Sequence, residues 1–143
     1  MALIELVYVS AASTSFTRPG LMALMEKARL RNREQNVTGV LLHDDGSFLQ
    51  VLEGEESVVS ATFEKIAADS RHGKVQVLSR RPIEQRTFGD WSMGVLWVDQ
   101  HAGRELGLNR YMRTGYTGGG LGSALVARVL NAFRDGNYRR AAA

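Results

Sequence analysis

The chain has 143 residues, with 18 Lys and Arg against 15 Asp and Glu, 15 Gly and no Cys. This length predicts one domain of about 100–200 residues, and 44% hydrophobic with 23% charged residues excludes wholesale disorder. The absence of Cys excludes disulfides, zinc–thiolate and iron–sulfur sites and cysteine nucleophiles. No stretch approaches the roughly 20 apolar residues of a membrane helix. The apolar N-terminus carries Glu5 without a basic segment, which predicts a strand rather than a signal peptide. We therefore expect a cytoplasmic protein without a membrane partner.

The basic surplus is small. The formal net charge is only +3, and the basic residues form no long run. A protein dedicated to nucleic acids usually concentrates its positive charge on one face or stripe. A nucleic-acid partner is therefore not expected.

Hydrophobic periodicity and turn residues predict seven elements before residue 100. Thr17 is a candidate N-cap of the first helix, with Pro19 in its first turn, and Gly54 is expected to end the third strand. The predicted strands cover 3–10, 37–43, 48–53, 74–80 and 92–98, and the predicted helices cover about 18–33 and 55–69.

This order, β-α-β-β-α-β-β, predicts an α+β, ferredoxin-like fold with a five-stranded mixed sheet. Two helices would cover one face of the sheet, and the other face would be apolar. A helical stripe of Leu121, Leu125, Val129 and Phe133 could cover that second face. We therefore expect a domain over 1–98 and a C-terminal helical cap over 99–143 that packs on the sheet.

Five side chains that carry a phenol, an amide, an indole or a thioether group could converge on one cavity. Gln50 lies mid-strand between apolar residues, where a buried amide needs hydrogen-bond partners, although an edge position facing solvent is an equal alternative. Tyr8 also lies mid-strand, and it could likewise be buried or face solvent. Asn32 could be an ordinary helix-end amide, and Trp91 and Met93 could be plain core residues. Together they offer donors and acceptors without a strong base or nucleophile, which suits a planar heteroaromatic ring.

The inner stripes of the two helices would place Leu24 and Ile66 against the two faces of such a ring. A metal site is not expected, because His43, His72 and His101 lie in separate elements without an i, i+4 partner. No Ser/His/Asp set of a hydrolase can be assembled either.

Several short motifs between residues 3 and 98 are similar to those of the BLUF family, the flavin-binding blue-light sensor modules. The segments that carry the resemblance are Val-Tyr-Val-Ser at 7–10, Arg-Asn at 31–32, Asn-Val-Thr-Gly-Val-Leu-Leu at 36–42, Phe-Leu-Gln-Val-Leu-Glu-Gly at 48–54, Asp-Ser-Arg-His at 69–72 and Asp-Trp-Ser-Met at 90–93. The 48–54 segment followed some forty residues later by Trp-Ser-Met is specific to the family rather than to the fold.

The resemblance implies a blue-light photoreceptor in which Tyr8 and Gln50 are the photoactive pair. Gln50 would bridge Tyr8 and the N5 and O4 atoms of a flavin. Asn32 would hold the pyrimidine edge of the ring, and Arg71 would lie on its O2 side. The implied cofactor is noncovalent FAD, and FMN or riboflavin could also fit because the ring makes most of the contacts.

By the same resemblance, His72 and Lys65 would assist at the ribityl and phosphate end of the flavin. Trp91 and Met93 would be the switch residues of the fifth strand. Arg31 departs from some relatives, which have His or Asn there, and this departure bears on spectral tuning. The implied partner is an unidentified downstream effector protein, and a homo-oligomer is expected.

Two other functions remain open on this fold. One is a flavin-dependent or acylphosphatase-like enzyme, because a fold alone does not decide a function. The other is an RNA-binding module, which should carry exposed aromatics in a Lys/Arg-Gly-Phe/Tyr-type strand motif that this sequence lacks. We expect no enzymatic activity, since the candidate cavity contains no strong base.

Overall fold

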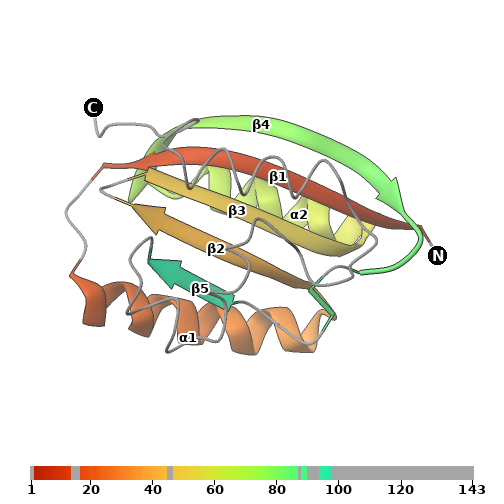
Figure 1. The fold of residues 1–143 in the computed structure, drawn as a ribbon, viewed down its shortest axis with the longest axis horizontal. Helices are drawn as coiled ribbons and strands as arrows, with labels where there is room; N and C mark the ends of the chain where they lie inside the picture. Colours follow the sequence, from red (N-terminus) through yellow and green to blue (C-terminus); the bar gives the residue numbers. More distant parts are fainter. Residues whose placement is uncertain (1, 14–16, 45–46, 87, 90–93, 98–143) are drawn as a thin grey trace, which may run out of the picture.

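The computed structural model describes residues 2–13, 17–44, 47–86, 88–89 and 94–97. Within these residues the elements alternate as the sequence pattern predicts (Figure 1). They are β1 (Leu3–Ala12), α1 (Arg18–Glu34), β2 (Thr38–Asp44), β3 (Ser47–Glu55), α2 (Glu56–Ala67), β4 (His72–Ile83) and β5 (Gly94–Trp97).

The strands form one sheet in the order β4-β1-β3-β2-β5, so β4 and β5 are its edges (Figure 1). The pairs β1–β4, β1–β3 and β2–β3 are antiparallel, whereas the short β5 runs parallel to β2. The four antiparallel strands and two helices confirm the predicted α+β, ferredoxin-like arrangement. The predicted helical cap over 99–143 lies outside the described residues.

Helix α1 begins and ends at residues that suit those positions. Thr17 adopts an extended conformation, and its Oγ1 accepts a hydrogen bond from Gly20 N at 3.0 Å, as the capping prediction requires. After the helix, Asn36 adopts a positive φ of 57°, which Asn tolerates better than most residues. The chain thereby turns directly into β2.

Strand β3 is longer than the sequence pattern indicates. Gly54 was expected to end it, but the strand continues to Glu55 because Gly54 pairs with Ile4 of β1. A side chain at Gly54 would approach Val59 of α2, with Cβ 3.2 Å from Val59 Cγ2. The glycine therefore allows close packing of the strand and the helix, and it does not mark a turn.

The face of the sheet that carries the helices holds a compact apolar core. Its buried members come from the strands, from both helices and from the residue that precedes β2: Ile4, Leu6, Tyr8, Ala12, Leu21, Val37, Leu41, Phe48, Leu52 and Val59. Burying each large aliphatic side chain contributes about 1.5–3 kcal/mol to folding. The two helices are thus fixed over the sheet, and any cavity between them has a rigid floor.

The opposite face is also buried, but it is not purely apolar as expected. Glu5 and Glu53 pair across β1 and β3 and are both 0% exposed. Arg81 Nε lies 3.0 Å from Glu5 Oε1, and Glu53 Oε1 accepts hydrogen bonds from Thr38 Oγ1 and Phe88 N, each at 3.0 Å. Buried carboxylates require such partners, because an unpaired charge in the interior is very costly.

The pairing of β1 with β4 is irregular close to Tyr8. The register shifts between Val7 and Tyr8 and again between Val9 and Ala11, and Lys74 in the second irregular stretch has a positive φ of 52°. Such bulges re-aim nearby side chains and occur often beside functional sites. They flank the strand segment that carries Tyr8.

Candidate functional site

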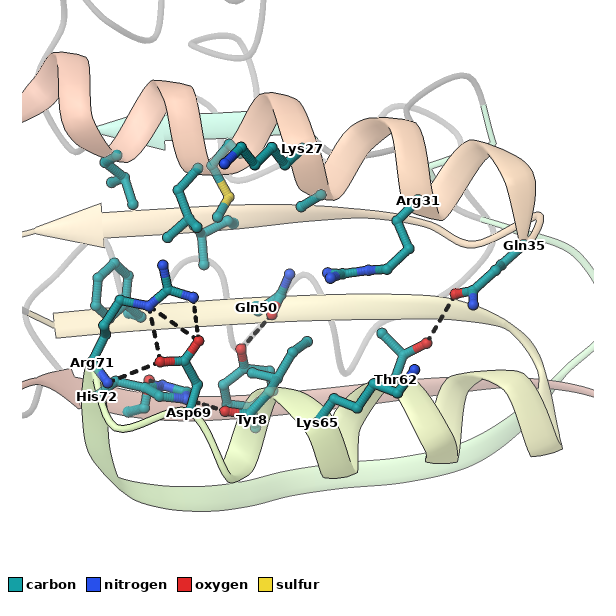
Figure 2. Close-up of a pocket in the computed structure, with 18 residues that line it drawn as sticks. Tyr8, Lys27, Arg31, Gln35, Gln50, Thr62, Lys65, Asp69, Arg71 and His72 are labelled. Atoms are coloured by element: carbon teal, nitrogen blue, oxygen red, sulfur yellow. Dashed lines mark hydrogen bonds and ion pairs between the residues drawn. The ribbon is translucent and has the colours of Figure 1, made fainter.

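A cavity of about 360 Å³ lies between α1 and α2, with the sheet as its floor (Figure 2). Its size is at the lower end of the roughly 300–1,000 Å³ typical of small-molecule sites. Apolar side chains make much of its wall: Leu21, Leu24, Met25, Ala28, Leu41, Phe48 and Ile66. Leu24 and Ile66 come from opposite helices, as expected for residues that contact the two faces of a flat ring.

Tyr8 and Gln50 lie at the floor of this cavity and are directly opposite each other in the β1–β3 register. The Tyr8 hydroxyl donates a hydrogen bond to Gln50 Oε1 (Figure 2). Gln50 also faces Leu41 of β2, so it belongs to a central strand, and it is 5% exposed. These positions exclude the solvent-facing edge alternative for Gln50.

The surroundings of Tyr8 keep its hydroxyl protonated. Burial raises the pKa of Tyr8 above its ordinary value of 10, because the phenolate would lose its hydration. The ring packs against Phe63 of α2 with centroids 5.2 Å apart, and His72 of β4 lies 6.4 Å away, centroid to centroid, edge-on. Tyr8 is therefore a fixed donor at neutral pH.

Arg71 is oriented beside the cavity by Asp69. Arg71 Nε lies 2.9 Å from Asp69 Oδ1, and Arg71 Nη2 also donates to Asp69 Oδ2 (Figure 2). These hydrogen bonds lower the pKa of Asp69 from 3.8 to about 2, with the guanidinium charge adding to the effect. Within the described residues, Arg71 Nη1 makes no hydrogen bond, so it can donate to a ligand.

The ion pair between Asp69 and Arg71 predicts that the protein loses stability in acid. Because the folded pKa of Asp69 is depressed, its contribution is fully present above the unfolded value of 3.8 and is lost as the pH falls toward 2. Between pH 4 and pH 2, the free energy of unfolding should therefore fall more steeply in the wild type than in Asp69→Asn. Urea unfolding over this range measures both slopes. Glu34→Gln, on the exposed side of α1, should keep the wild-type slope, and an unchanged slope in Asp69→Asn would contradict the assignment.

His72 is held by two hydrogen bonds within the protein. Its Nε2 contacts the Ile66 carbonyl oxygen, and its Nδ1 lies 2.9 Å from Ser10 Oγ. Because a carbonyl oxygen only accepts, Nε2 must carry a proton, and Nδ1 of the neutral ring then accepts from the Ser10 hydroxyl. His72 lines the cavity, and in this arrangement it joins β1, α2 and β4. A contact between His72 and the ribityl or phosphate end of a flavin stays a prediction.

The other predicted site residues are distributed differently. Lys65 lines the cavity, whereas Asn32 is 1% exposed at the end of α1 and does not contribute to the lining. A contact between Asn32 and a ligand therefore stays a prediction. Trp91 and Met93 lie outside the described residues.

Several lining residues were not singled out from the sequence. Lys27, Gln35, Thr62 and Asp69 all face the cavity, and Arg31 does so as well (Figure 2). Thr62 Oγ1 lies 3.4 Å from Gln35 Oε1 and so joins the two helices at one end of the cavity. The α1 residues among them continue the i, i+3 and i, i+4 spacing of its apolar stripe, and extending that stripe would have identified them.

A family model described as "Sensors of blue-light using FAD" matches residues 3–94, well over half of the chain. The chain belongs to the BLUF family. Its members are flavin-binding blue-light sensors, and the Tyr8–Gln50 pair at the cavity floor lies within the matched residues.

A curated relative supports the same membership. Photoactivated adenylate cyclase subunit beta of Euglena gracilis is 36% identical over 92 residues, which are 64% of this chain and 11% of that protein. The chain therefore spans only a small part of the length of this relative.

Solved BLUF structures share the fold. The dark-state structure of BlrB, a BLUF protein, aligns with a TM-score of 0.69 and 27% identity and covers 94% of this chain and 96% of that chain. BlrP1 of Klebsiella pneumoniae, solved with FMN and cyclic diGMP, aligns with a TM-score of 0.76 and 28% identity over 94% of this chain and 35% of that chain.

The described part of this BLUF chain contains neither a candidate metal-binding cluster nor a candidate membrane-spanning helix. No group of three His, Asp or Glu residues there could hold a metal ion. No helix in the same residues is long and apolar enough to cross a membrane.

Proposed function

We propose that this chain is a blue-light photoreceptor that binds FAD noncovalently between α1 and α2 and signals by rearranging the hydrogen bonds of Tyr8, Gln50 and the flavin. The observation that carries the proposal is the hydrogen bond from Tyr8 to Gln50 at the floor of the cavity. A buried phenol and a buried amide that line the same cavity suit a ligand with a polar edge.

The lining fits a flavin in shape and in donor chemistry. When bound, the flavin supplies light absorption and electron acceptance. Leu24 and Ile66 would contact its two faces, Gln50 and Arg71 would donate to its polar edge, and Asn32 would hold the pyrimidine end. FMN is an alternative cofactor, and the FMN in the BlrP1 structure supports it.

Tyr8 and Gln50 would carry out the switch. Tyr8, protonated at neutral pH, would release an electron and its hydroxyl proton after illumination and then regain both. Gln50 has an acceptor and a donor at the same place, so rotation or tautomerisation of its amide exchanges the partners without moving the backbone. The two arrangements need to differ by only a few kcal/mol for light to populate the minor one.

The output would leave through the segment that contains Trp91 and Met93, which we propose as switch residues on the resemblance alone. We further propose that residues 1–98 are the sensor domain and that 99–143 form a helical cap on the sheet. The BlrB alignment over 94% of the chain extends past the family match and supports one continuous unit. The effector protein is unidentified, and a cytoplasmic homo-oligomer is part of this proposal.

We propose that the chain has no catalytic activity of its own. Among the described lining residues, no imidazole or carboxylate is unengaged for hydrolysis, since His72 is bonded at both ring nitrogens and Asp69 is paired with Arg71. The cyclase activity named for the Euglena relative belongs to a protein of which this chain matches 11%.

Purification of the full chain tests flavin binding. We expect a yellow protein with about one flavin per chain, and Asn32→Ala should retain less flavin, because a buried hydrogen bond to the ring is lost at a cost of about 1–3 kcal/mol. Flavin released by heating and quantified by chromatography measures the content. A colourless chain that binds no added flavin would refute the proposal, and catalytic turnover in the dark would favour the enzyme alternative.

A further inference from the structure

The segment that follows β4 is held against the start of β2 by the guanidinium of Arg86. Arg86 Nη1 donates hydrogen bonds to Thr38 Oγ1 at 2.8 Å and to the Glu53 carbonyl oxygen at 3.0 Å. Its Nη2 donates to the Asn36 carbonyl oxygen at 2.8 Å. Figure 1 shows the green trace that follows β4 reaching the start of β2 beside the end of α1. One side chain thus joins the turn after α1, the start of β2 and the end of β3.

A second contact fixes the same segment two residues later. The Phe88 amide donates to Glu53 Oε1 at 3.0 Å, and Thr38 Oγ1 donates to the same oxygen at 3.0 Å. Both Glu53 and Phe88 are buried. A buried carboxyl group needs such donors, and losing one is costly. We call Arg86, Thr38, Glu53 and the Phe88 amide the clasp.

The turn to which Arg86 donates is the C-terminal cap of α1. Val37 N donates to the Asn32 carbonyl oxygen at 2.8 Å, and Asn36 N donates to the Arg33 carbonyl oxygen at 3.3 Å. With the positive φ of 57° at Asn36, these two bonds make a Schellman motif. Asn32, which is proposed to hold the pyrimidine end of the flavin, therefore belongs to the turn that Arg86 holds.

This turn needs an external hydrogen bond to keep its position. Asn36 occupies the left-handed region, which costs free energy for a residue with a side chain, and both Gln35 and Asn36 are exposed. The ends of helices also fray. A charged donor on the Asn36 carbonyl oxygen opposes both tendencies, because such hydrogen bonds are about twice as strong as neutral ones. Arg86 therefore stabilises the end of α1 at the place that determines where Asn32 lies.

We propose that Arg86 is a positioning residue for the cofactor, because the clasp holds the C-terminal turn of α1 where the Asn32 amide meets the pyrimidine edge of the flavin. Arg86 itself does not line the cavity. This inference rests on the proposed flavin site and adds a residue outside it that controls affinity. Coupling between two sites is reciprocal, so bound flavin should in turn stabilise the clasp. The segment between β4 and β5 would then respond to cofactor binding.

The test is a double-mutant cycle on the affinity of the flavin-free full chain for FAD, measured by equilibrium dialysis. Arg86→Gln should weaken FAD binding by at least about fivefold, the lower end of typical couplings between sites. In an Asn32→Ala background, the same substitution should change the affinity by less than about twofold, because the residue that Arg86 positions is already absent. A purely structural role would give equal losses in both backgrounds or no loss in either.

Arg80→Gln is the matched control, because it removes the same charge from an exposed position of β4. It should keep the wild-type affinity. Arg86→Lys should restore only part of what Arg86→Gln loses, since an ammonium lacks the planar fork of a guanidinium. If Arg86→Gln does not fold, Thr38→Val decides, because it removes the shared hydroxyl of the clasp and keeps the branched shape. Its loss of affinity should be smaller and should again require Asn32.

Hydrogen exchange of the Phe88 amide measures the coupling in the reverse direction, since this amide donates within the clasp. Saturating FAD should slow its exchange more in the wild type than in Asn32→Ala, and equal slowing would overturn the coupling. Unchanged FAD affinity in Arg86→Gln, or equal losses with and without Asn32, would overturn the positioning role and leave the flavin site intact. Failure of the wild type to bind FAD would overturn the proposed function itself.

Discussion

Gln50→Leu should retain flavin and lose the light response completely. Leucine keeps roughly the volume of the glutamine side chain but has neither a hydrogen-bond donor nor an acceptor. Tyr8 then has no amide to bond with, and the side chain at position 50 cannot exchange hydrogen-bond partners. The flavin absorption band should therefore stay in place under blue light. Visible absorption spectra before, during and after illumination measure this.

Tyr8→Phe should give the same spectroscopic result for a different reason. Phenylalanine keeps the ring that packs on Phe63, but it removes the hydroxyl that donates to Gln50. The variant should also lose about 1–3 kcal/mol of unfolding free energy, because Gln50 Oε1 loses its buried donor. Phe63→Leu is the control, since it changes the packing of Tyr8 but leaves the hydrogen bond. A normal reversible shift in either Tyr8→Phe or Gln50→Leu would refute the switch.

Gly39→Ala should strongly destabilise the fold. Gly39 of β2 pairs with Leu52 of β3, and a Cβ on Gly39 would lie 1.9 Å from the Val51 carbonyl oxygen. That atom belongs to the backbone of the central strand, so it cannot rotate away. We expect a loss of about 3 kcal/mol or more in unfolding free energy.

Urea unfolding followed by circular dichroism measures this loss, and Gly73→Ala is the matched control. A Cβ at Gly73 in the edge strand β4 would lie 3.7 Å from Ser13 Oγ, an ordinary contact. The control should therefore change stability by less than about 1 kcal/mol. Equal stabilities of the two variants would contradict the close approach of β2 and β3 at Gly39.

The sequence predicted the helices and the four antiparallel strands because each has a clear hydrophobic period. Element ends were less predictable. Strand β4 covers His72–Ile83 instead of 74–80, because pairing with β1 extends it through two register shifts that no alternation of side chains reveals. Gly54 was misassigned because a glycine can mark a turn or a close contact with a helix, and only the packing of α2 decides between them.

The site was predictable where the strand register determines it. The strand pattern makes Tyr8 and Gln50 candidate buried polar residues on separate strands, and the antiparallel pairing of β1 and β3 places them opposite each other. The role of His72 was not predictable, because its partners Ser10 and Ile66 come from other elements. The cationic lining was missed because Lys27 looks like an ordinary exposed lysine until the cavity is known.

The central claim is that light rearranges the hydrogen bonds of Tyr8, Gln50 and the flavin. The illuminated-minus-dark absorption spectrum of the purified, flavin-loaded wild-type chain tests it most directly. A new hydrogen bond to flavin O4 stabilises the excited state more than the ground state, so the account predicts a shift of the visible band to the red that decays in the dark. A flavin-loaded wild-type chain whose band stays in place, or bleaches without a red-shifted product, would contradict it.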